Sequence, residues 1–386
     1  MKRILLSLLL CLAALSAFCQ DDTLTRARSR YAVNNFSDDD KYTAVQTYET
    51  VSVSQPKGRK VRNIILMIGD GMGLEQAACG WVVNGGKLNI DNFPYVGIQR
   101  TYARNSLVTD SSAAGSAIAT GHKTNYDHIS ADPDGTPNES VMEYAASKGK
   151  KTGIAVTCRI NDATPAAFCT HITNRDLEED VISQMAESKV DFLIGGGLRY
   201  WNSRSDGRDI VEEMKEKGYT YVDTEEQLKA VGSLPVLGLF ADLEMKPSLE
   251  RGDILEQSAI KALELLDCRK GFFLMIEGSS IDDWCHRQKV GYAMEELFDF
   301  DRTVGHVLKW AEKDGETLVI VTGDHCTGGL SILDGSIEEN SVKVNFSTGG
   351  HNGIALPVYA YGPHAEDFTG IYENTELSDR IKSLIR

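Results

Sequence analysis

The stretch VRNIILMIGDGMG (residues 61–73) carries the pattern that best indicates the fold. Its unbroken apolar run, residues 64–68, is followed at once by Gly69, Asp70 and Gly71. Short continuous apolar runs are typical of strands that are buried on both faces of a parallel sheet. The flanking glycines let the backbone pack closely where the strand ends. The stretch predicts a buried strand that delivers the Asp70 carboxylate to one edge of a sheet.

Similar apolar runs recur along the chain, with helical patterns between them. The predicted strands are 61–68, 153–157, 190–194, 271–276, 317–322 and 356–361. Residues 254–266 and 292–313 place apolar side chains at helical spacing, and both are predicted helices. Strands that alternate with helices predict the α/β class: a central, largely parallel twisted sheet sandwiched between helices.

Polar side chains with metal-binding chemistry follow three of the predicted strands. Asp70, Glu277 and the pair Asp324–His325 each come directly after such a strand and adjoin a glycine. A single acidic residue in this place is usually a helix cap or a turn residue. Because ligands of α/β sheets bind outside the carboxyl ends of the strands, three such cases together favour one shared site.

Two further histidines lie in acidic or glycine-rich surroundings. Asp282 and His286 are four residues apart and would share one face of a helix, and His351 follows two glycines. Zinc takes histidine nitrogen and carboxylate oxygen in this manner. A solvated helical pair and a turn histidine are the ordinary alternatives. Because Cys285 and Cys326 adjoin two of the histidines, thiolate ligation is a further alternative.

A nucleophile candidate lies at the start of a predicted helix in VTDSSAAGSAIATG (residues 108–121). The small, alanine-rich run after Asp110 places Ser111 in the first turn, where backbone N–H groups and the helix dipole favour an anion. A nearby metal ion would lower the pKa of the serine hydroxyl. Taken alone, the pattern is a routine helix cap, and Ser112 is an alternative nucleophile.

Hard oxygen ligands and a phosphate-binding cation follow in the chain. Asp162 and Thr164 offer a carboxylate and a hydroxyl two residues apart, a combination that suits magnesium. Arg175 carries the planar guanidinium that binds two phosphate oxygens at once. An Asx turn and a surface arginine are the alternatives for the two segments when each is taken alone.

The motifs in this order resemble the alkaline phosphatase family. The resemblance extends from about residue 61 to 381, and its most specific segments are MIGDGMG, VTDSSAAGSAIATG, NDATPAA, EGSSIDDWCH, TGDH and STGGHNG. It implies an alkaline-phosphatase-like fold. The 25 residues between His325 and His351 leave no room for a large crown insertion, so a compact member is expected.

The resemblance also implies a role for each candidate residue. Two Zn²⁺ ions would be held by Asp70, Asp324 and His325 beside Ser111, and by Asp282, His286 and His351. One Mg²⁺ ion would be held by Asp162, Thr164 and Glu277, and Arg175 would bind phosphate. The implied activity is the hydrolysis of a broad range of small phosphate monoesters through a phosphoserine intermediate. The family's habit suggests a homodimer, although compact members can be monomeric.

Two other functions compete with this interpretation. Phosphodiesterases of the same superfamily share the two-zinc core but usually lack the third metal site and use other phosphate contacts. A catalytically inactive metal-binding or phosphate-binding protein would be expected to have lost Ser111 or a ligand, and none is missing. The chain departs from its relatives at Asp283, where an extra carboxylate could repel phosphate or recruit another cation.

The N-terminus has the layout of a secretory signal peptide. Lys2 and Arg3 precede an apolar run, residues 4–15, which is too short to span a bilayer. We therefore expect a signal peptide at 1–19, an N-terminal arm or linker at 20–60, and a single catalytic domain at 61–386. The protein would be periplasmic or secreted. Lipid anchoring through Cys19 is the less favoured alternative, because the preceding Phe18 is bulky.

The overall charge limits which partners the protein can have. The chain has a net charge of −16, and loss of the two basic residues of the signal would make it −18. Such an acidic protein is a poor non-specific binder of nucleic acid, and a site for an anionic substrate must carry its own positive charge. Bound metal ions would supply it. Six of the eight cysteines lie beyond the signal, and Cys158 and Cys169 flank the predicted magnesium segment.

Overall fold

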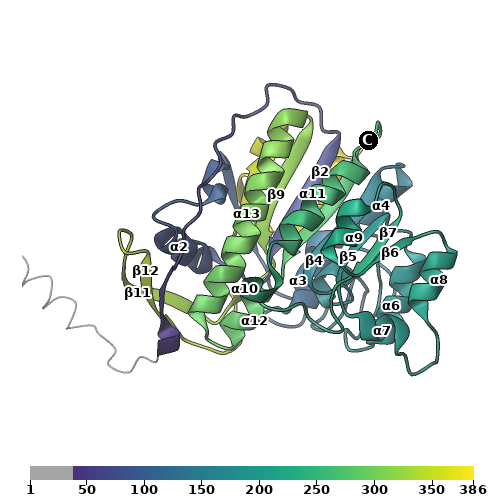
Figure 1. Cartoon of the computed structure of the whole chain (residues 1–386), viewed down its shortest axis with the longest axis horizontal. Coiled ribbons are helices and arrows are strands. Elements are labelled where there is room, and N and C mark those ends of the chain that lie inside the picture. Colours follow the sequence, from purple (N-terminus) through teal and green to yellow (C-terminus); the bar gives the residue numbers. More distant parts are fainter. Residues whose placement is uncertain (1–37) are drawn as a thin grey trace, which may run out of the picture. The chain divides into compact units, whose positions relative to one another are not determined.

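A ten-stranded sheet forms the centre of the computed structural model, which describes residues 38–386 (Figure 1). Its strands are β2 (Asn63–Gly69), β3 (Tyr95–Arg100), β4 (Lys151–Arg159), β5 (Phe192–Gly196), β6 (Thr220–Val222), β7 (Val236–Leu239), β8 (Phe272–Gly278), β9 (Thr317–Gly323), β14 (Leu356–Tyr361) and β15 (Gly370–Glu373). The spatial order is β15-β3-β14-β9-β2-β8-β4-β5-β7-β6. Only β14 runs antiparallel to its neighbours in this sheet.

Helices cover both faces of the sheet. They are α2 (Leu74–Val83), α3 (Ser111–Thr120), α4 (Val141–Ser147), α5 (Ala163–Ala166), α6 (Glu178–Glu187), α7 (Leu198–Asn202), α8 (Ile210–Glu216), α9 (Glu225–Ala230), α10 (Ser248–Arg251), α11 (Ile254–Leu266), α12 (Ser280–His286), α13 (Val290–Asp314) and α14 (Thr375–Leu384). One apolar core lies under α2, α9, α11 and α13. The other lies under α3, α4, α6, α8 and α14.

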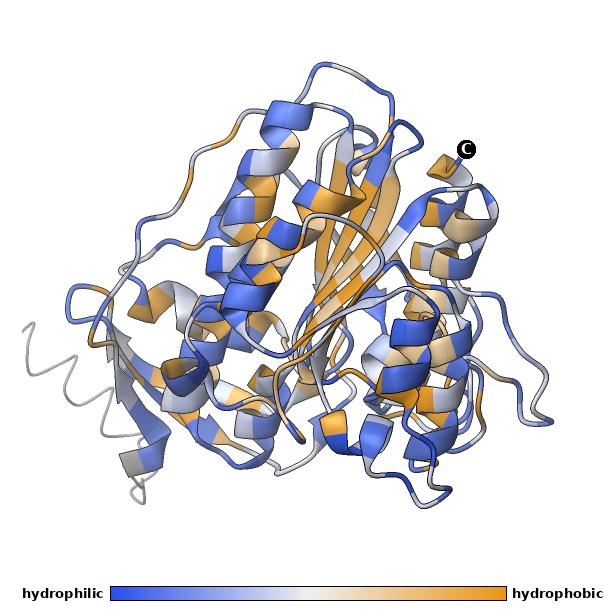
Figure 2. Ribbon diagram, turned by 45° about the vertical axis from the view of Figure 1, so that its right-hand side comes forward, coloured by the Kyte–Doolittle hydropathy of each residue, from blue (hydrophilic) through white to orange (hydrophobic). Residues whose placement is uncertain are grey.

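The burial of β2 shows why its sequence is apolar throughout. Ile65 and Met67 pack into the first core, while Ile64, Leu66 and Ile68 pack into the second. Successive side chains of a strand point to opposite faces, so a strand between two layers of helices needs apolar residues at every position. Each fully buried side chain of this size contributes roughly 1.5–3 kcal/mol. Figure 2 shows the same contrast between the apolar central strands and the polar outer faces of the helices.

The predicted fold class is confirmed. Each of the six predicted strands falls on a strand of the central sheet, and the predicted helix 254–266 has the bounds of α11. The sequence analysis missed β3, β6, β7 and β15. Three of these are four residues long or shorter, and β3 mixes buried with exposed positions, so none contains a long apolar run.

The segment between His325 and His351 forms strands of two small sheets. β11 (Leu330–Ser336) and β12 (Ser341–Phe346) form a hairpin, and β1 (Lys41–Thr43) pairs with its second strand. β10 (Cys326–Thr327) pairs with β13 (His351–Asn352) in antiparallel fashion. The β10–β13 pair brings His351 back beside the segment that follows His325, and the short hairpin agrees with the expected compact fold.

The described part of the N-terminal segment lies against the catalytic body. The backbone N–H of Tyr48 donates to Asn84 and that of Val51 donates to Asn89. Three short 3₁₀ turns complete the secondary structure: Asp38–Asp40, Asn89–Asn92 and Ala365–Phe368. The predicted signal peptide, Cys19 and residues 20–37 of the predicted arm lie outside the described residues.

Candidate active site

The predicted ligand side chains gather at the carboxyl ends of three adjacent strands. β2 lies between β8 and β9, parallel to both, and Gly69 pairs with Gly278 on one side and with Gly323 on the other. Asp70 and Asp324 each follow such a paired glycine, and Glu277 precedes one. The register therefore places the three carboxylates at the same edge of the sheet.

His325 is the centre of the first cluster. Its Nε2 atom lies 3.0 Å from the hydroxyl oxygen of Ser111, 3.3 Å from Asp70 Oδ1 and 3.1 Å from Asp324 Oδ2. The ring is fully buried, and burial lowers its pKa to about 4. His325 is thus neutral at neutral pH, so a lone pair on one ring nitrogen is available to a cation.

Ser111 is the first residue of α3, as the sequence predicts. The residue before it, Asp110, caps the helix because its carboxylate accepts the backbone N–H of Ala113 at 3.0 Å. The opening turn directs backbone N–H groups toward the position in front of the serine. Ser111, and not its neighbour Ser112, makes the contact with His325, and the Ser112 hydroxyl has no hydrogen-bond partner within residues 38–386.

The second cluster consists of Asp282, His286 and His351. The first two lie on α12, where the i,i+4 spacing sets His286 Nε2 at 3.2 Å from Asp282 Oδ2. His351 Nε2 approaches His286 Nε2 to 3.1 Å and Asp282 Oδ1 to 3.6 Å. Three potential ligand atoms thus lie close enough together to hold one metal ion. The hydrogen bond and charge of Asp282 raise the pKa of His286 to about 9.

The candidate magnesium residues lie beside the first cluster. Asp162 is the N-cap of α5, and its Oδ1 accepts a hydrogen bond from Arg175 Nη2 at 2.7 Å. Arg175 Nη1 also lies 3.6 Å from Asp110 Oδ2, so the guanidinium is held between two carboxylates. Thr164 and Glu277 are buried nearby, and each has one side-chain oxygen without a hydrogen-bond partner in the described chain.

The electrostatics of the site favour the binding of cations. Burial and the neighbouring Asp324 and Asp282 raise the pKa of Asp70 well above its usual value. Burial together with Asp162 and Asp324 does the same for Glu277, and the pKa of Asp324 rises to about 6. Buried carboxylate oxygens without partners are costly, and metal ions are the usual remedy. The donor set, imidazole nitrogen with carboxylate and hydroxyl oxygen, fits zinc and magnesium.

A cavity of about 350 Å³ opens over these clusters. Residues that the sequence analysis did not select also line it: Tyr126, Asp127, Arg159 and Glu244. Arg159 ends β4 at the carboxyl edge, but it is not a metal ligand and adjoins no glycine, so the pattern that selected Asp70 does not include it. Glu244 lies in an irregular segment with no local signal, and it reaches the site through an ion pair with Arg159.

Thiolate ligation finds no support in the geometry. Cys285 and Cys326 both place their sulfur atoms against Gln76, behind the site. Burial raises the pKa of Cys326 to about 11. All six cysteines of the described chain are free, so Cys158 and Cys169 form no disulfide.

The sheet and the clusters at its carboxyl edge define an α/β enzyme with a serine among candidate metal ligands. The sequence profile described as alkaline phosphatase matches residues 61–342. The chain is 31% identical to alkaline phosphatase 4 of Bacillus subtilis, over 89% of this chain and 92% of that protein. The chain belongs to the alkaline phosphatase family.

Solved structures agree. The alkaline phosphatase of the Antarctic bacterium TAB5 is 37% identical and superposes with a TM-score of 0.79, over 84% of this chain and 98% of that one. A mutant of the TAB5 enzyme, with aspartate in place of a histidine and Mg bound in the M3 site, is 36% identical. It also has a TM-score of 0.79, over 86% of this chain and 99% of that one. These relatives support an alkaline phosphatase that hydrolyses phosphate monoesters, and the alternative of a phosphodiesterase is not needed.

Proposed function

We propose that the enzyme hydrolyses phosphate monoesters through a phosphoseryl intermediate on Ser111, at a site for two Zn²⁺ ions and one Mg²⁺ ion. The observation that carries the proposal is the 3.0 Å contact between Ser111 Oγ and His325 Nε2. Around that contact, oxygens of Asp70 and Asp324 are buried and have no hydrogen-bond partner in the described chain. A nucleophile and potential metal ligands thus converge on one position.

The proposed ligand sets follow the two histidine clusters and the pair of hard oxygen donors. Asp70, Asp324 and His325 would hold one zinc ion, and Asp282, His286 and His351 the other. Asp162, Thr164 and Glu277 would hold magnesium, and the Mg-bound relative with an aspartate introduced in place of histidine supports an oxygen-rich third site. When bound, the ions would lower the pKa of the serine hydroxyl and neutralise charge that develops on the reacting oxygens.

The chain's own groups position the substrate and carry the covalent step. Ser111 Oγ attacks phosphorus, the bond to the ester oxygen breaks, and the alcohol leaves. Water then cleaves the Oγ–P bond and regenerates the serine with release of inorganic phosphate. Arg175 would bind two of the non-bridging oxygens, since Asp162 and Asp110 fix its guanidinium beside the serine. Burial disfavours its charge, but these carboxylates outweigh burial and raise the pKa of Arg175.

The decisive assay compares p-nitrophenyl phosphate with bis-p-nitrophenyl phosphate from pH 7 to 11, before and after chelation. We expect strong monoesterase activity that chelation abolishes and that zinc with magnesium restores. Preference for the diester would contradict the proposed roles of Arg175 and the third metal site. Absence of both activities in protein with metal bound would instead indicate a binding protein.

We also propose that residues 1–19 direct export and that residues 61–386 act as one catalytic domain in the periplasm or outside the cell. No helix within residues 38–386 has the length and apolarity needed to cross a membrane. Fractionation of the producing cell, with N-terminal sequencing of the mature protein, tests the export. We further propose a homodimer, which light scattering of the purified enzyme tests.

A further inference from the structure

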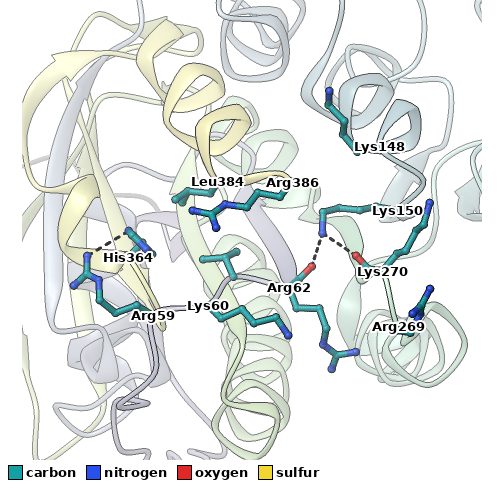
Figure 3. Close-up of a pocket in the computed structure, with 11 residues that line it drawn as sticks. Arg59, Lys60, Arg62, Lys148, Lys150, Arg269, Lys270, His364, Leu384 and Arg386 are labelled. Carbon is teal, nitrogen blue, oxygen red and sulfur yellow. Dashed lines mark hydrogen bonds between the residues drawn. The ribbon is translucent and has the colours of Figure 1, made fainter.

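A second cavity, of about 680 Å³, lies away from the candidate active site and shares no lining residue with it. Figure 3 shows the side chains that line this cavity. Eight lysine and arginine side chains line it, and no acidic side chain does. The chain as a whole carries a net charge of −16, so a cluster of eight basic side chains is unusual for this protein. The basic residues come from distant segments of the chain, and the cavity exists only in the folded protein.

The cavity lies at the amino ends of the central strands. Arg62 directly precedes β2, Lys150 directly precedes β4, and Lys270 lies two residues before β8. These three strands are parallel neighbours, so their first residues share one edge of the sheet. The candidate active site occupies the opposite edge, where the same strands end. A ligand in this cavity would therefore not contact the catalytic residues.

Part of the basic charge is balanced at the rim. Arg59 pairs with Glu366 at 2.6 Å, and Lys60 pairs with Glu316 at 2.9 Å. Arg62 pairs with three acidic side chains, Asp267, Asp314 and Glu316. These three cations are therefore already paired.

Four other basic side chains that line the cavity have no acidic partner in the described part of the chain. Within residues 38–386, no carboxylate lies within ion-pair distance of Lys148, Lys150, Arg269 or Lys270. Lys148, Arg269 and Lys270 are exposed, so their side chains can adjust to a ligand. The adjacent residue Arg386 adds one further guanidinium.

Lys150 connects the floor of the cavity to the sheet. Its side chain is 7% exposed, and Nζ donates to the backbone oxygens of Arg62 at 2.7 Å and Lys270 at 2.9 Å (Figure 3). Burial, with the charges of Arg62 and Lys60, lowers the pKa of Lys150. A buried ammonium group that bonds only neutral carbonyls leaves a net positive charge, which a bound anion would offset.

We propose that this cavity binds a compact multivalent oxyanion, one that carries several phosphate or sulfate groups, independently of the candidate active site. The volume lies within the range of small-molecule sites. Ammonium and guanidinium groups are the usual partners of phosphate and sulfate oxygens. The same chemistry would come from a soluble polyphosphorylated molecule or from the headgroups of anionic lipids. The site makes no use of the proposed serine or metal ligands.

Calorimetric titration with inositol hexasulfate tests the site, because this anion is not a phosphate ester. The full-length, metal-loaded protein would be compared with the triple variant Lys148→Ala, Arg269→Ala, Lys270→Ala. A matched control, Lys215→Ala, Lys229→Ala, Lys246→Ala, removes the same charge from exposed lysines elsewhere. We expect one saturable site, whose affinity falls at least about tenfold in the cavity variant and less than about twofold in the control. Melting curves would check that both variants fold.

A second arm identifies the source of the anion. Sedimentation with vesicles of phosphatidylglycerol and phosphatidylcholine would show lipid binding that the cavity variant loses, if the anion is a headgroup. Binding of the hexasulfate without vesicle binding would assign the cavity to a soluble anion. Failure of the unchanged protein to bind either probe, or equal affinities in the two triple variants, would overturn the proposal. Hydrolysis of p-nitrophenyl phosphate would be unaffected, so the outcome is separate from that of the proposed function.

Discussion

At the carboxyl ends of β2, β8 and β9, carboxylates and imidazoles crowd together, whereas at the amino ends of β2, β4 and β8, lysines and arginines line a cavity. The two edges of the sheet differ in the burial of their charged side chains as well as in the sign of the charge. Asp324 and His325 are completely buried, while Lys148, Arg269 and Lys270 are exposed. Buried charge needs a fixed counter-charge, but exposed charge is screened by water and salt. We therefore expect permanent metal ions at one edge and reversible, salt-sensitive anion binding at the other.

The largest effect is expected from Ser111→Ala. Loss of the hydroxyl that meets His325 should lower turnover of p-nitrophenyl phosphate by about 10³-fold or more, since no covalent intermediate can form. Acid quenching with radiolabelled substrate should trap phosphate on the unchanged protein and not on the variant. Turnover of Ser112→Ala, the matched control, should stay within a few-fold of that of the unchanged protein.

Arg175→Ala should have an intermediate effect and lower kcat/KM about 10- to 100-fold.

Trapped phosphate that disappears with Ser112→Ala, while Ser111→Ala stays active, would reverse the assignment of the nucleophile. The contact between Ser111 and His325 would then have no catalytic role, and the carboxyl edge would be an ordinary cluster of acidic residues.

Metal removal should have the next largest effect, and on stability as well as on activity. Without ions, the crowded carboxylates around Asp70 and Glu277 lose their counter-charge. At metal concentrations of 100 times Kd, bound ions would stabilise the fold by about 2.7 kcal/mol each, so chelation should lower the thermal midpoint. Hydrogen exchange should increase at the carboxyl ends of β2 and β9 and stay unchanged near Lys150. Equal melting curves with and without chelator would contradict a buried metal centre.

A smaller effect is expected from the unusual carboxylate beside the site. Asp283 lines the active-site cavity, where its negative charge would repel an incoming phosphate dianion. Burial and the neighbouring Asp282 raise the pKa of Asp283 to about 6, so it is ionised at the alkaline pH of the assay. Asp283→Asn should raise kcat/KM for p-nitrophenyl phosphate about two- to fivefold at pH 9, and less in high salt. Glu250→Gln is the exposed control and should change nothing. A decrease would mean that Asp283 binds a cation or the substrate.

The smallest effect is expected from the ion pair between His171 and Glu143, which belongs neither to the active-site clusters nor to the basic cavity. His171 Nε2 lies 2.9 Å from Glu143 Oε1, and its Nδ1 lies 2.9 Å from the backbone oxygen of Ser130. Burial favours the neutral ring, but these hydrogen bonds outweigh burial and raise the pKa of His171 above 6.5. Burial likewise opposes ionisation of Glu143, and His171 overcomes it to lower the pKa below 4.5.

The sign of the pH dependence follows from these two shifts. Protonated His171 contributes stability that is complete below pH 6.5 and is lost as the pH rises through the raised pKa. Glu143 contributes stability above pH 4.5 that is lost as the pH falls through the lowered pKa. His171→Gln should therefore cost most between about pH 4.5 and 6.5, roughly 0.5–1 kcal/mol for this partly exposed pair. Urea unfolding at pH 5.5 and pH 9 measures it, and a cost that grows toward pH 9 would refute the pairing.

Local sequence patterns were sufficient for six of the ten strands of the central sheet and for the start of the serine helix. The run 64–68 is apolar at every position because both faces of β2 are buried, and this requirement can be read from the sequence. Asp110 and the small residues after it likewise indicate the beginning of α3, because a cap and its first turn are contiguous in the chain. The short edge strands lack such a signal, since few of their side chains enter a core.

The sequence by itself determined the class of fold, the kinds of ligand side chain and the strand ends that carry them. Only the tertiary structure decided which distant side chains meet: that His351 reaches the Asp282–His286 pair of α12, that Arg159 draws Glu244 toward the cavity, and that Lys150 lies among other cations. The reason is physical. Burial and helix capping act over a few neighbouring residues, whereas the meeting of distant charges depends on the order of strands in the sheet, which no local pattern encodes.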